Sequence, residues 1–345
     1  MKALYKTDTG IGNMELLDAP IPEPGPGEAC IEIKAAGICG SDLHIYDGSI
    51  NIPIRPPVIV GHEFAGTIHA LGEGVDNWRV DDRITSETAI TICGKCSYCR
   101  TGFYNLCPDR TFLGYSADGA FAEFTVVPSR LLHCLPENIS FQEGALSEPL
   151  ACCVHGVLEL TEIVAGDLVV ILGPGAIGLL SMLLAKAAGG IVLVAGISKD
   201  ADRLRLAKEI GADHTVDIET EDLTGIVNKL SGNLGADVVI ECSGADAAVD
   251  TGLGLVRKRG QFTQVGLFGK PINVDFEKIA YKEIKVTGSF SQKWTAWDKG
   301  LNLLEKGIID LKPLISDIFP ISEWKAAFKK FESGEGLKIL LDPKQ

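Results

Sequence analysis

One short stretch of the sequence gathers the side chains that bind zinc. Residues 36–66 read AGICGSDLHIYDGSINIPIRPPVIVGHEFAG and contain Cys39, His44, His62 and Glu63. Thiolate, imidazole and carboxylate are zinc ligands, and a catalytic zinc takes three protein ligands and leaves one position open. We therefore predict that Cys39 and His62 bind a catalytic zinc. The alternative is that Cys39 is a buried thiol and His62 a hydrogen-bonded histidine of the core.

A cluster of cysteines predicts a second metal site of a different kind. The stretch CGKCSYCRTGFYNLC has the pattern C-x2-C-x2-C-x7-C, formed by Cys93, Cys96, Cys99 and Cys107. Two-residue gaps let successive thiolates converge on one ion, and four thiolates describe a closed structural zinc site. The bacterial iron–sulfur pattern has a different last gap, so zinc is favoured over a cluster. The ion would stabilise a lobe over about 90–110 that is poor in apolar residues.

A further acid lies outside both segments. Glu148 precedes Pro149 in the helical stretch 141–160, and its neighbours Leu146 and Leu150 are apolar. A carboxylate in apolar surroundings needs a partner such as a metal ion. The alternative is a solvated surface charge.

The second half of the sequence contains a dinucleotide-binding pattern. An apolar strand over 169–172 leads into a glycine-rich turn, which is followed by an apolar helix and another strand over 191–195. The glycines permit a tight turn and let a pyrophosphate approach the helix N-terminus. A strand before the motif and a helix after it are the context that supports this interpretation. The predicted cofactor-binding residues are Gly173, Gly175, Ala176, Ile177 and Gly178, with Val265 and Gly266 after a later strand.

The end of the second strand indicates which dinucleotide is bound. An NAD site usually has an acid there that accepts the ribose hydroxyls, but this sequence reads AGISK over 195–199. Ser198, Lys199 and Arg203 could accept a 2′-phosphate, with no carboxylate to repel it. We therefore favour NADP over NAD. NAD stays open because two nearby acids could turn inward, namely Asp200 and Asp202.

Two domains are expected to position these groups. Residues 2–127 alternate short β-rich runs with turn clusters, which indicates a compact β domain. Residues 153–286 alternate strands and helices, which indicates a doubly wound parallel sheet. The last sixty residues or so turn helical and end in the strand LKILLD, so the chain is expected to return to the first domain. We predict an α/β protein with a catalytic domain at 1–152 and 287–345 and a Rossmann domain at 153–286.

Composition restricts the partners. The chain has 32 basic and 46 acidic residues and a net charge of −14, which repels nucleic acid and anionic membranes. The apolar span 177–197 contains Lys186 and a pair of glycines, so we expect a helix and a strand rather than a membrane helix. The N-terminus lacks the apolar core of a signal peptide. We therefore expect a cytoplasmic protein with a small-molecule substrate, in which the remaining cysteines are reduced core thiols.

Together these motifs resemble the zinc-containing medium-chain alcohol dehydrogenases, in particular the sorbitol (polyol) and threonine dehydrogenase branch. The resemblance covers nearly the whole chain and includes the four-cysteine lobe. It implies a GroES-like catalytic domain, two zinc ions per chain, and a homodimer or homotetramer. The shorter motifs that carry it are CGSDLH at 39–44, GHE at 61–63, EGALSEPL at 143–150, GPGAIG at 173–178 and GEGLKILL at 334–341.

The resemblance also implies roles for individual residues. The catalytic zinc would be held by Cys39 and His62, with Glu148 at the place where the polyol branch has a glutamate. Glu63 would be a fourth, exchanging ligand or a neighbour of the ligands. Ser41 would hydrogen-bond the substrate oxygen and pass its proton toward solvent through His44.

The implied reaction is hydride transfer between NAD(P) and a secondary alcohol. Zinc lowers the pKa of an alcohol, and the nicotinamide accepts the hydride. The segment GSFSQKW at 288–294 has Ser291 where sorbitol dehydrogenases have an arginine, and Lys293 lies nearby. HIYDG at 44–48 and DGAFAEF at 118–124 resemble the threonine dehydrogenases. We predict a polyol or sugar dehydrogenase, with L-threonine 3-dehydrogenase as the alternative and a non-catalytic nucleotide-binding relative as a third possibility.

Overall fold

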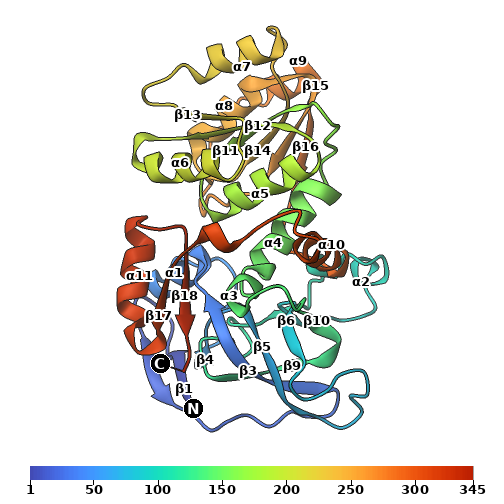
Figure 1. Cartoon of the computed structure of the whole chain (residues 1–345), viewed down its shortest axis with the longest axis vertical. Coiled ribbons are helices and arrows are strands. Elements are labelled where there is room, and N and C mark those ends of the chain that lie inside the picture. Colours follow the sequence, from blue (N-terminus) through green and yellow to red (C-terminus); the bar gives the residue numbers. More distant parts are fainter. Residues whose placement is uncertain (345) are drawn as a thin grey trace. The chain divides into compact units, whose positions relative to one another are not determined.

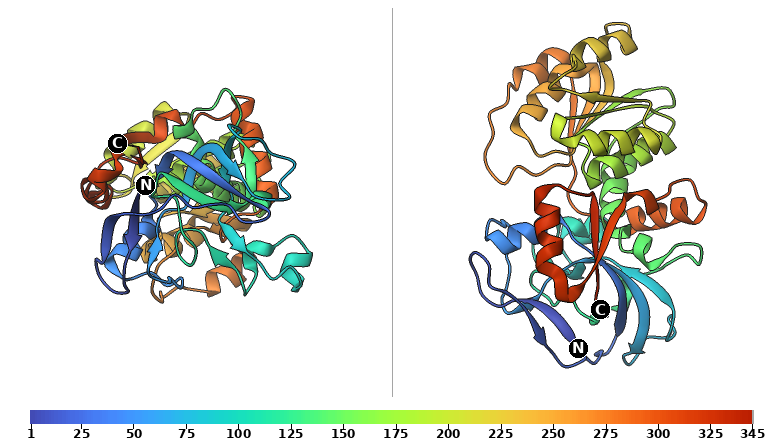
Figure 2. Two further views of the ribbon diagram at one scale, coloured as in Figure 1. Left: turned by 90° about the horizontal axis from the view of Figure 1, so that it is seen from below. Right: turned by 60° about the vertical axis from the view of Figure 1, so that its left-hand side comes forward.

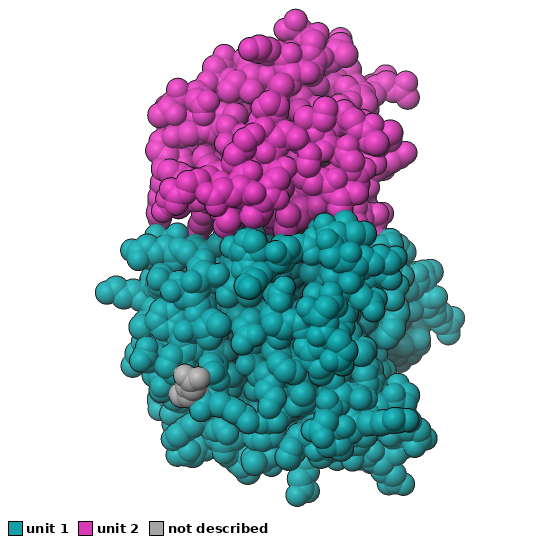
Figure 3. Space-filling model, viewed as in Figure 1, with its two compact units in different colours: residues 1–148, 292–345 teal, residues 149–291 magenta. Residues whose placement is uncertain are grey.

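The chain forms two compact units. The computed structural model describes residues 1–344. Unit 1 comprises Met1–Glu148 together with the chain from Gln292 onward, and unit 2 comprises Pro149–Ser291 (Figure 3). Within the described residues, no helix has both the length and the apolar character needed to cross a membrane.

Unit 1 is built mainly from β-strands (Figure 1). Its strands are β1 (Lys2–Lys6), β2 (Met14–Asp18), β3 (Glu28–Gly37), β4 (Val58–Ile59), β5 (Glu63–Leu71), β6 (Arg83–Ser86), β7 (Ala89–Thr91), β8 (Thr111–Phe112), β9 (Phe124–Pro128), β10 (Leu132–Cys134), β17 (Ile315–Pro320) and β18 (Lys338–Asp342). The largest sheet has the order β10-β6-β5-β3-β18-β17, and β9 also pairs with β3. The smaller sheets have the orders β2-β1-β4 and β7-β8. β3 is therefore the centre of the unit.

The C-terminal segment completes the central sheet of unit 1. Leu340 and Leu341 of β18 pair antiparallel with Gly37 and Ala36 of β3. Both termini accordingly lie in this unit (Figure 2). This pairing places β18 beside the end of β3, a little before Cys39. The helices of this unit are α1 (Gly40–Asp47), α2 (Ser97–Arg100), α3 (Phe141–Gly144), α10 (Trp294–Glu305) and α11 (Trp324–Ser333), and α4 (Ser147–Val154) begins in it.

Unit 2 is a six-stranded parallel sheet with helices. Its elements are β11 (Leu168–Leu172), α5 (Ala176–Ala187), β12 (Ile191–Gly196), α6 (Ala201–Glu209), β13 (His214–Asp217), α7 (Leu223–Ser231), β14 (Ala236–Glu241), α8 (Asp246–Leu255), β15 (Val256–Gln264), α9 (Glu277–Lys282) and β16 (Lys285–Gly288). The strand order is β13-β12-β11-β14-β15-β16. Every residue of β11 is buried, as expected for a central parallel strand. The strand order reverses at β11 and β14, where doubly wound sheets bind their ligands.

Most predicted elements are present, with two differences. The strands and helices expected in unit 2 are found, and the apolar span 177–197 is α5 followed by β12. Sequence patterns did not predict α1, whose eight residues include both glycine and aspartate. The helical stretch 141–160 is divided into α3, α4 and a π-helical turn over His155–Glu159.

Candidate catalytic metal centre and cofactor site

Three of the predicted metal ligands lie together in unit 1. The ligand atoms of Cys39, His62 and Glu63 all lie within 4.8 Å of one another. Cys39 is the N-cap of α1, two residues after the end of β3, while Glu63 is the first residue of β5. β3 and β5 are antiparallel and pair Gly37 with Glu63. The sheet therefore brings the two segments together, and Gly37 is required because a Cβ there would lie 2.3 Å from a Glu63 carboxylate oxygen.

Asp42 lies beside two of these groups, and its position was not predicted. One of its oxygens accepts a hydrogen bond from the backbone N–H of Cys39 at 2.8 Å, and the other lies 3.6 Å from His62 Nδ1. The side chain is fully buried. Burial raises the pKa of Asp42 to about 6, against the opposing effect of His62. At this distance Asp42 and the His62 ring interact through charge and do not form a hydrogen bond.

The charges around His62 fit a bound cation. Burial lowers the pKa of His62, but the charges of Asp42, Cys39 and Glu148 outweigh this effect and raise the pKa to about 10. Oε1 of the buried Glu63 has no hydrogen-bond partner among the described residues. Buried negative charge without a partner is unfavourable, and a divalent ion would compensate for it. The donor set of sulfur, nitrogen and oxygen is one that zinc accepts.

Lys338 of β18 binds the third candidate ligand. Its ammonium forms an ion pair with Glu63 Oε2 and donates a hydrogen bond to the carbonyl oxygen of Ile38 at 2.9 Å. The two side chains are 3% and 1% exposed. Burial lowers the pKa of Lys338, but the Glu63 carboxylate outweighs burial, and the pKa is raised. Glu63 thus keeps only one oxygen available for a metal. The motif GLKILL contains this lysine, but only the pairing of β18 with β3 reveals its partner.

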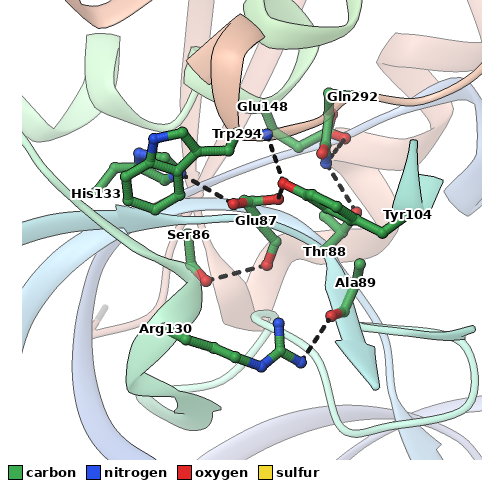
Figure 4. A network of polar contacts seen from close by, with 10 residues as sticks. All are labelled: Ser86, Glu87, Thr88, Ala89, Tyr104, Arg130, His133, Glu148, Gln292 and Trp294. Atoms are coloured by element: carbon green, nitrogen blue, oxygen red, sulfur yellow. Dashed lines mark hydrogen bonds and ion pairs between the residues drawn. The ribbon is translucent and has the colours of Figure 1, made fainter. Parts of the chain in front are cut away.

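Glu148 lies outside this group and has a separate polar partner (Figure 4). It is 8% exposed, and its charge contributes to the raised pKa of His62. Gln292 Nε2 donates to Glu148 Oε1 at 3.4 Å and to Thr88 Oγ1 at 2.9 Å. The structure groups Glu63 with Cys39 and His62, and the role of Glu148 as a zinc ligand stays a prediction. The role of Gln292 was not predicted.

Gln292→Ala should weaken metal binding at the catalytic site about tenfold, because Gln292 holds Glu148, which we predict as a zinc ligand, and partners of ligating groups typically contribute 10–100-fold to affinity. The zinc dissociation constant of the catalytic site, measured by competition with a chelator, tests this expectation. Gln142→Ala changes a glutamine of α3 and is the matched control. Equal dissociation constants for the two variants would contradict a positioning role for Gln292.

A second buried carboxylate connects the cysteine lobe to the rest of unit 1 (Figure 4). Glu87 accepts a hydrogen bond from Tyr104 Oη at 2.6 Å and lies 3.3 Å from His133 Nε2. Tyr104 Oη in turn accepts from the backbone N–H of Trp294 at 2.5 Å. Burial and the charge of Glu87 raise the pKa of Tyr104, so the phenol keeps its proton. Tyr104 lies three residues before Cys107, and this network therefore fixes the lobe to the start of α10.

The four cysteines of the lobe converge. The sulfur atoms of Cys93, Cys96, Cys99 and Cys107 all lie within 4.8 Å of one another. The backbone N–H groups of Cys96 and Cys99 donate to the sulfurs of Cys93 and Cys96 at 3.3 and 3.4 Å. Hydrogen bonds from the backbone of Lys95 and Cys96 lower the pKa of Cys93 to about 6, which favours the thiolate. Four sulfurs in this arrangement fit a structural zinc.

The two residues of the expected proton path both lie on α1. Ser41 is half-buried, whereas His44 is exposed and its Nδ1 lies 2.9 Å from Ser49 Oγ. Tyr115, which was not predicted, lies beside the site, with its ring centroid 5.5 Å from that of His62. Burial and then the charge of Cys39 raise the pKa of Tyr115, and a hydrogen bond with Ser41 partly opposes them. Tyr115 therefore keeps its proton.

The glycine-rich turn of unit 2 fits a dinucleotide. Gly173 has φ +100°, and a Cβ there would lie 2.8 Å from the Cβ of Ser243. A Cβ at Gly178 would lie 1.9 Å from the carbonyl oxygen of Gly173. Gly175 has open space in the Cβ direction, and no side chain caps α5, which begins at Ala176 and Ile177. The N–H groups of the first turn of α5 are thus left for an anion such as a pyrophosphate.

Glu241 holds the other predicted cofactor segment. The N–H groups of Val265 and Gly266 both donate to the carbonyl oxygen of Glu241 at 2.9 Å. The buried Glu241 side chain accepts from the N–H of Ser243 at 2.7 Å and from Gln264 Nε2 at 2.7 Å. The ends of β14 and β15 are therefore fixed beside each other at the carboxyl edge of the sheet.

Ser198 has acidic partners that were not foreseen. Its Oγ donates to Asp217 Oδ2 at 2.7 Å, and its N–H donates to Glu219 Oε2 at 2.9 Å. The expectation that no carboxylate lies beside this hydroxyl is wrong. Both acids belong to the end of β13 and the loop after it, so inspection of the second strand alone does not reveal them.

The two basic residues predicted to bind the 2′-phosphate, Lys199 and Arg203, follow Ser198 in the sequence. Lys199 is exposed. Arg203 Nη1 lies 3.5 Å from Asp200 Oδ1, one turn earlier. Asp200 therefore faces a guanidinium within its own helical segment.

The two units and their sites define a zinc-binding alcohol dehydrogenase. Residues 25–137 match the family described as alcohol dehydrogenase GroES-like domain, and residues 176–306 match the family described as zinc-binding dehydrogenase. The chain belongs to this family, and the predicted GroES-like and Rossmann fold class is confirmed. It is an oxidoreductase that acts with NAD or NADP.

Individual relatives match over almost their whole length. The chain is 47% identical to a sorbitol dehydrogenase of Halalkalibacterium halodurans, covering 99% of each chain. It is 40% identical to a D-arabitol-phosphate dehydrogenase of Enterococcus avium, covering 99% of this chain and 97% of that one. A zinc-binding dehydrogenase from Sinorhizobium meliloti 1021, solved bound to NADP, superposes with a TM-score of 0.91 at 34% identity and 99% coverage of both chains.

Proposed function

We propose that the chain interconverts a secondary alcohol of a polyol or sugar and the corresponding ketone. The observation that carries this proposal is the convergence of Cys39, His62 and Glu63 at one buried point in a chain that also has the GPGAIG turn. The polyol class is supported by relatives named for sorbitol and for D-arabitol phosphate.

Each residue of the metal centre would have its own role in this reaction. Bound zinc would polarise the substrate oxygen, and the nicotinamide would carry the hydride. Cys39 and His62 would hold the ion, with Glu63 or Glu148 as a further ligand. Asp42 places a negative charge 3.6 Å from His62 Nδ1.

Ser41 would exchange a proton with the substrate oxygen at its Oγ. His44 is exposed at the other end of α1 and would pass that proton to water.

A substrate panel tests the proposal. The zinc-loaded chain should oxidise at least one polyol or polyol phosphate, detected by the absorbance of the reduced nicotinamide, and should reduce the matching keto sugar. L-Threonine belongs in the panel as the alternative substrate. Activity with threonine alone would replace the polyol assignment. No activity with any substrate, despite bound zinc, would favour a nucleotide-binding protein without catalysis.

We further infer a catalytic domain at 1–152 and 287–345 and a cofactor domain at 153–286.

We also infer that the chain forms a homodimer or homotetramer. Large apolar side chains of unit 2 support self-association, since Leu267, Phe276 and Tyr281 are 72%, 73% and 74% exposed. The sheet of unit 2 also ends in β16 as an edge strand. Light scattering that gives the mass of a single chain would contradict self-association.

A further inference from the structure

The carboxyl edge of the unit 2 sheet carries acids from two adjacent strands. β12 ends at Gly196, which pairs with Asp217 at the end of β13. The N–H of Ile218 donates to the carbonyl oxygen of Gly196 at 2.9 Å. In sheets of this order, the ribose of the adenosine half is recognised at the end of the second strand. Ser198 and Asp217 therefore both lie at the place where the ribose would bind.

The donors of Ser198 are already engaged. Its hydroxyl donates to Asp217 and its N–H donates to Glu219, at 2.7 and 2.9 Å. Asp217 is fixed from both sides, because its Oδ1 accepts from the N–H of Glu219 at 3.0 Å and its own N–H donates to Glu221 Oε2 at 2.9 Å. The hydrogen bond from Ser198 lowers the pKa of Asp217, so this carboxylate is charged at neutral pH.

This arrangement should bind NAD and NADP with different affinities. The 2′-hydroxyl of NAD is a hydrogen-bond donor, and a carboxylate is the acceptor that suits it. The 2′-phosphate of NADP carries only acceptors and negative charge, so it would meet two carboxylates and compete with them for the Ser198 donors. Arg203 and Lys199 are the cations of this segment, and Arg203 lies beside Asp200.

We propose that Asp217 and Glu219 act together as a selectivity filter that disfavours NADP relative to NAD. This inference rests on the proposed dinucleotide site at the GPGAIG turn. It assigns the choice between NAD and NADP to side chains of β13 and the loop after it. The acid that usually makes this choice lies at the end of the second strand, which is β12 here.

The test is a comparison of binding rather than turnover. The dissociation constants of NADH and NADPH are measured by nucleotide fluorescence for the full chain and for the double variant Asp217→Asn, Glu219→Gln. Loss of two negative charges beside Ser198, where the 2′-phosphate would bind, should tighten NADPH binding at least about tenfold. The dissociation constant of NADH should stay within about threefold of the original or rise, since the ribose hydroxyl loses an ionised hydrogen-bond acceptor.

Glu209→Gln is the matched control, because Glu209 is an exposed acid at the end of α6 whose partner is Arg205. It should leave the ratio of the two dissociation constants within about threefold of the original. Glu219→Gln alone changes an exposed side chain and should shift the ratio in the same direction by a smaller factor, which covers the case of a misfolded double variant.

The possible failures are distinguishable. An unchanged ratio in both the double and the Glu219→Gln variants, in a chain that binds NADH, would overturn the filter and leave the dehydrogenase assignment in place. A chain that binds neither nucleotide would overturn both the filter and the proposed function.

Discussion

Cys39→Ser should lose one of two zinc ions per chain and at least about a thousandfold in activity, while the protein remains folded. Cys39 supplies the only sulfur of the catalytic group, and the alcohol group of serine is a much poorer zinc ligand than a thiolate. Loss of Lewis-acid stabilisation of the transition state by several kcal/mol corresponds to this factor. Metal analysis, steady-state kinetics and circular dichroism measure the three parts of the prediction.

Cys96→Ser is the matched control for Cys39→Ser. It should remove the other zinc and lower the melting temperature, because the four sulfurs hold together a lobe whose large apolar side chains Tyr98, Phe103 and Leu106 are exposed. Any loss of activity should follow from instability. If Cys39→Ser unfolds the chain while Cys96→Ser stays folded and inactive, the catalytic and structural roles are exchanged.

Lys338→Met should destabilise the chain without its catalytic zinc by about 3–5 kcal/mol, since the buried Glu63 carboxylate then has neither a metal ion nor its ion-pair partner. Removing one member of a buried pair has this large effect, although replacing both members is often nearly neutral. The double variant Lys338→Met, Glu63→Gln should therefore recover much of the lost stability. Urea denaturation measures the free energy of unfolding of each variant.

Lys344→Met is the control for Lys338→Met. Lys344 pairs with Glu32, but half of its side chain is exposed, and surface pairs contribute at most about 1 kcal/mol. Similar losses of unfolding free energy for Lys338→Met and Lys344→Met would contradict the importance of the buried pair beside the metal centre.

The chemistry of the site was predictable wherever it depended on residues close together in sequence. Each of these motifs lies within a few positions of the sequence, because metal and phosphate binding require fixed short spacings. They are the four cysteines, the GPGAIG turn, CGSDLH and GHE. Strands of unit 2 were predictable for a similar reason, since fully buried parallel strands are continuous apolar runs.

Partners from distant segments were not predictable. Lys338 reaches Glu63 only because β18 pairs with β3, and Gln292 reaches Glu148 across 144 residues of sequence. Asp217 faces Ser198 because β13 lies beside β12. A local sequence pattern shows which charged groups are present. The pairing of these groups into ion pairs and hydrogen bonds depends on the register of the sheet. The surroundings of Ser198 show this, because the sequence pattern of the second strand omitted acids of the neighbouring strand.

Asp42 is an intermediate case. It lies inside CGSDLH, three residues after Cys39, and an acid at that position of a helix start can reach back to the N-cap backbone. The spacing indicated the contact with Cys39, but the approach to His62 required the β3–β5 pairing.

Anomalous diffraction at the zinc edge, on crystals of the zinc-loaded chain, tests the metal centre most directly. We predict two peaks per chain, one among the four lobe cysteines and the other about 2.3 Å from Cys39 Sγ and about 2.1 Å from a His62 ring nitrogen. A strong peak in the lobe together with an empty position between Cys39 and His62 would contradict the catalytic zinc, and with it the assigned reaction.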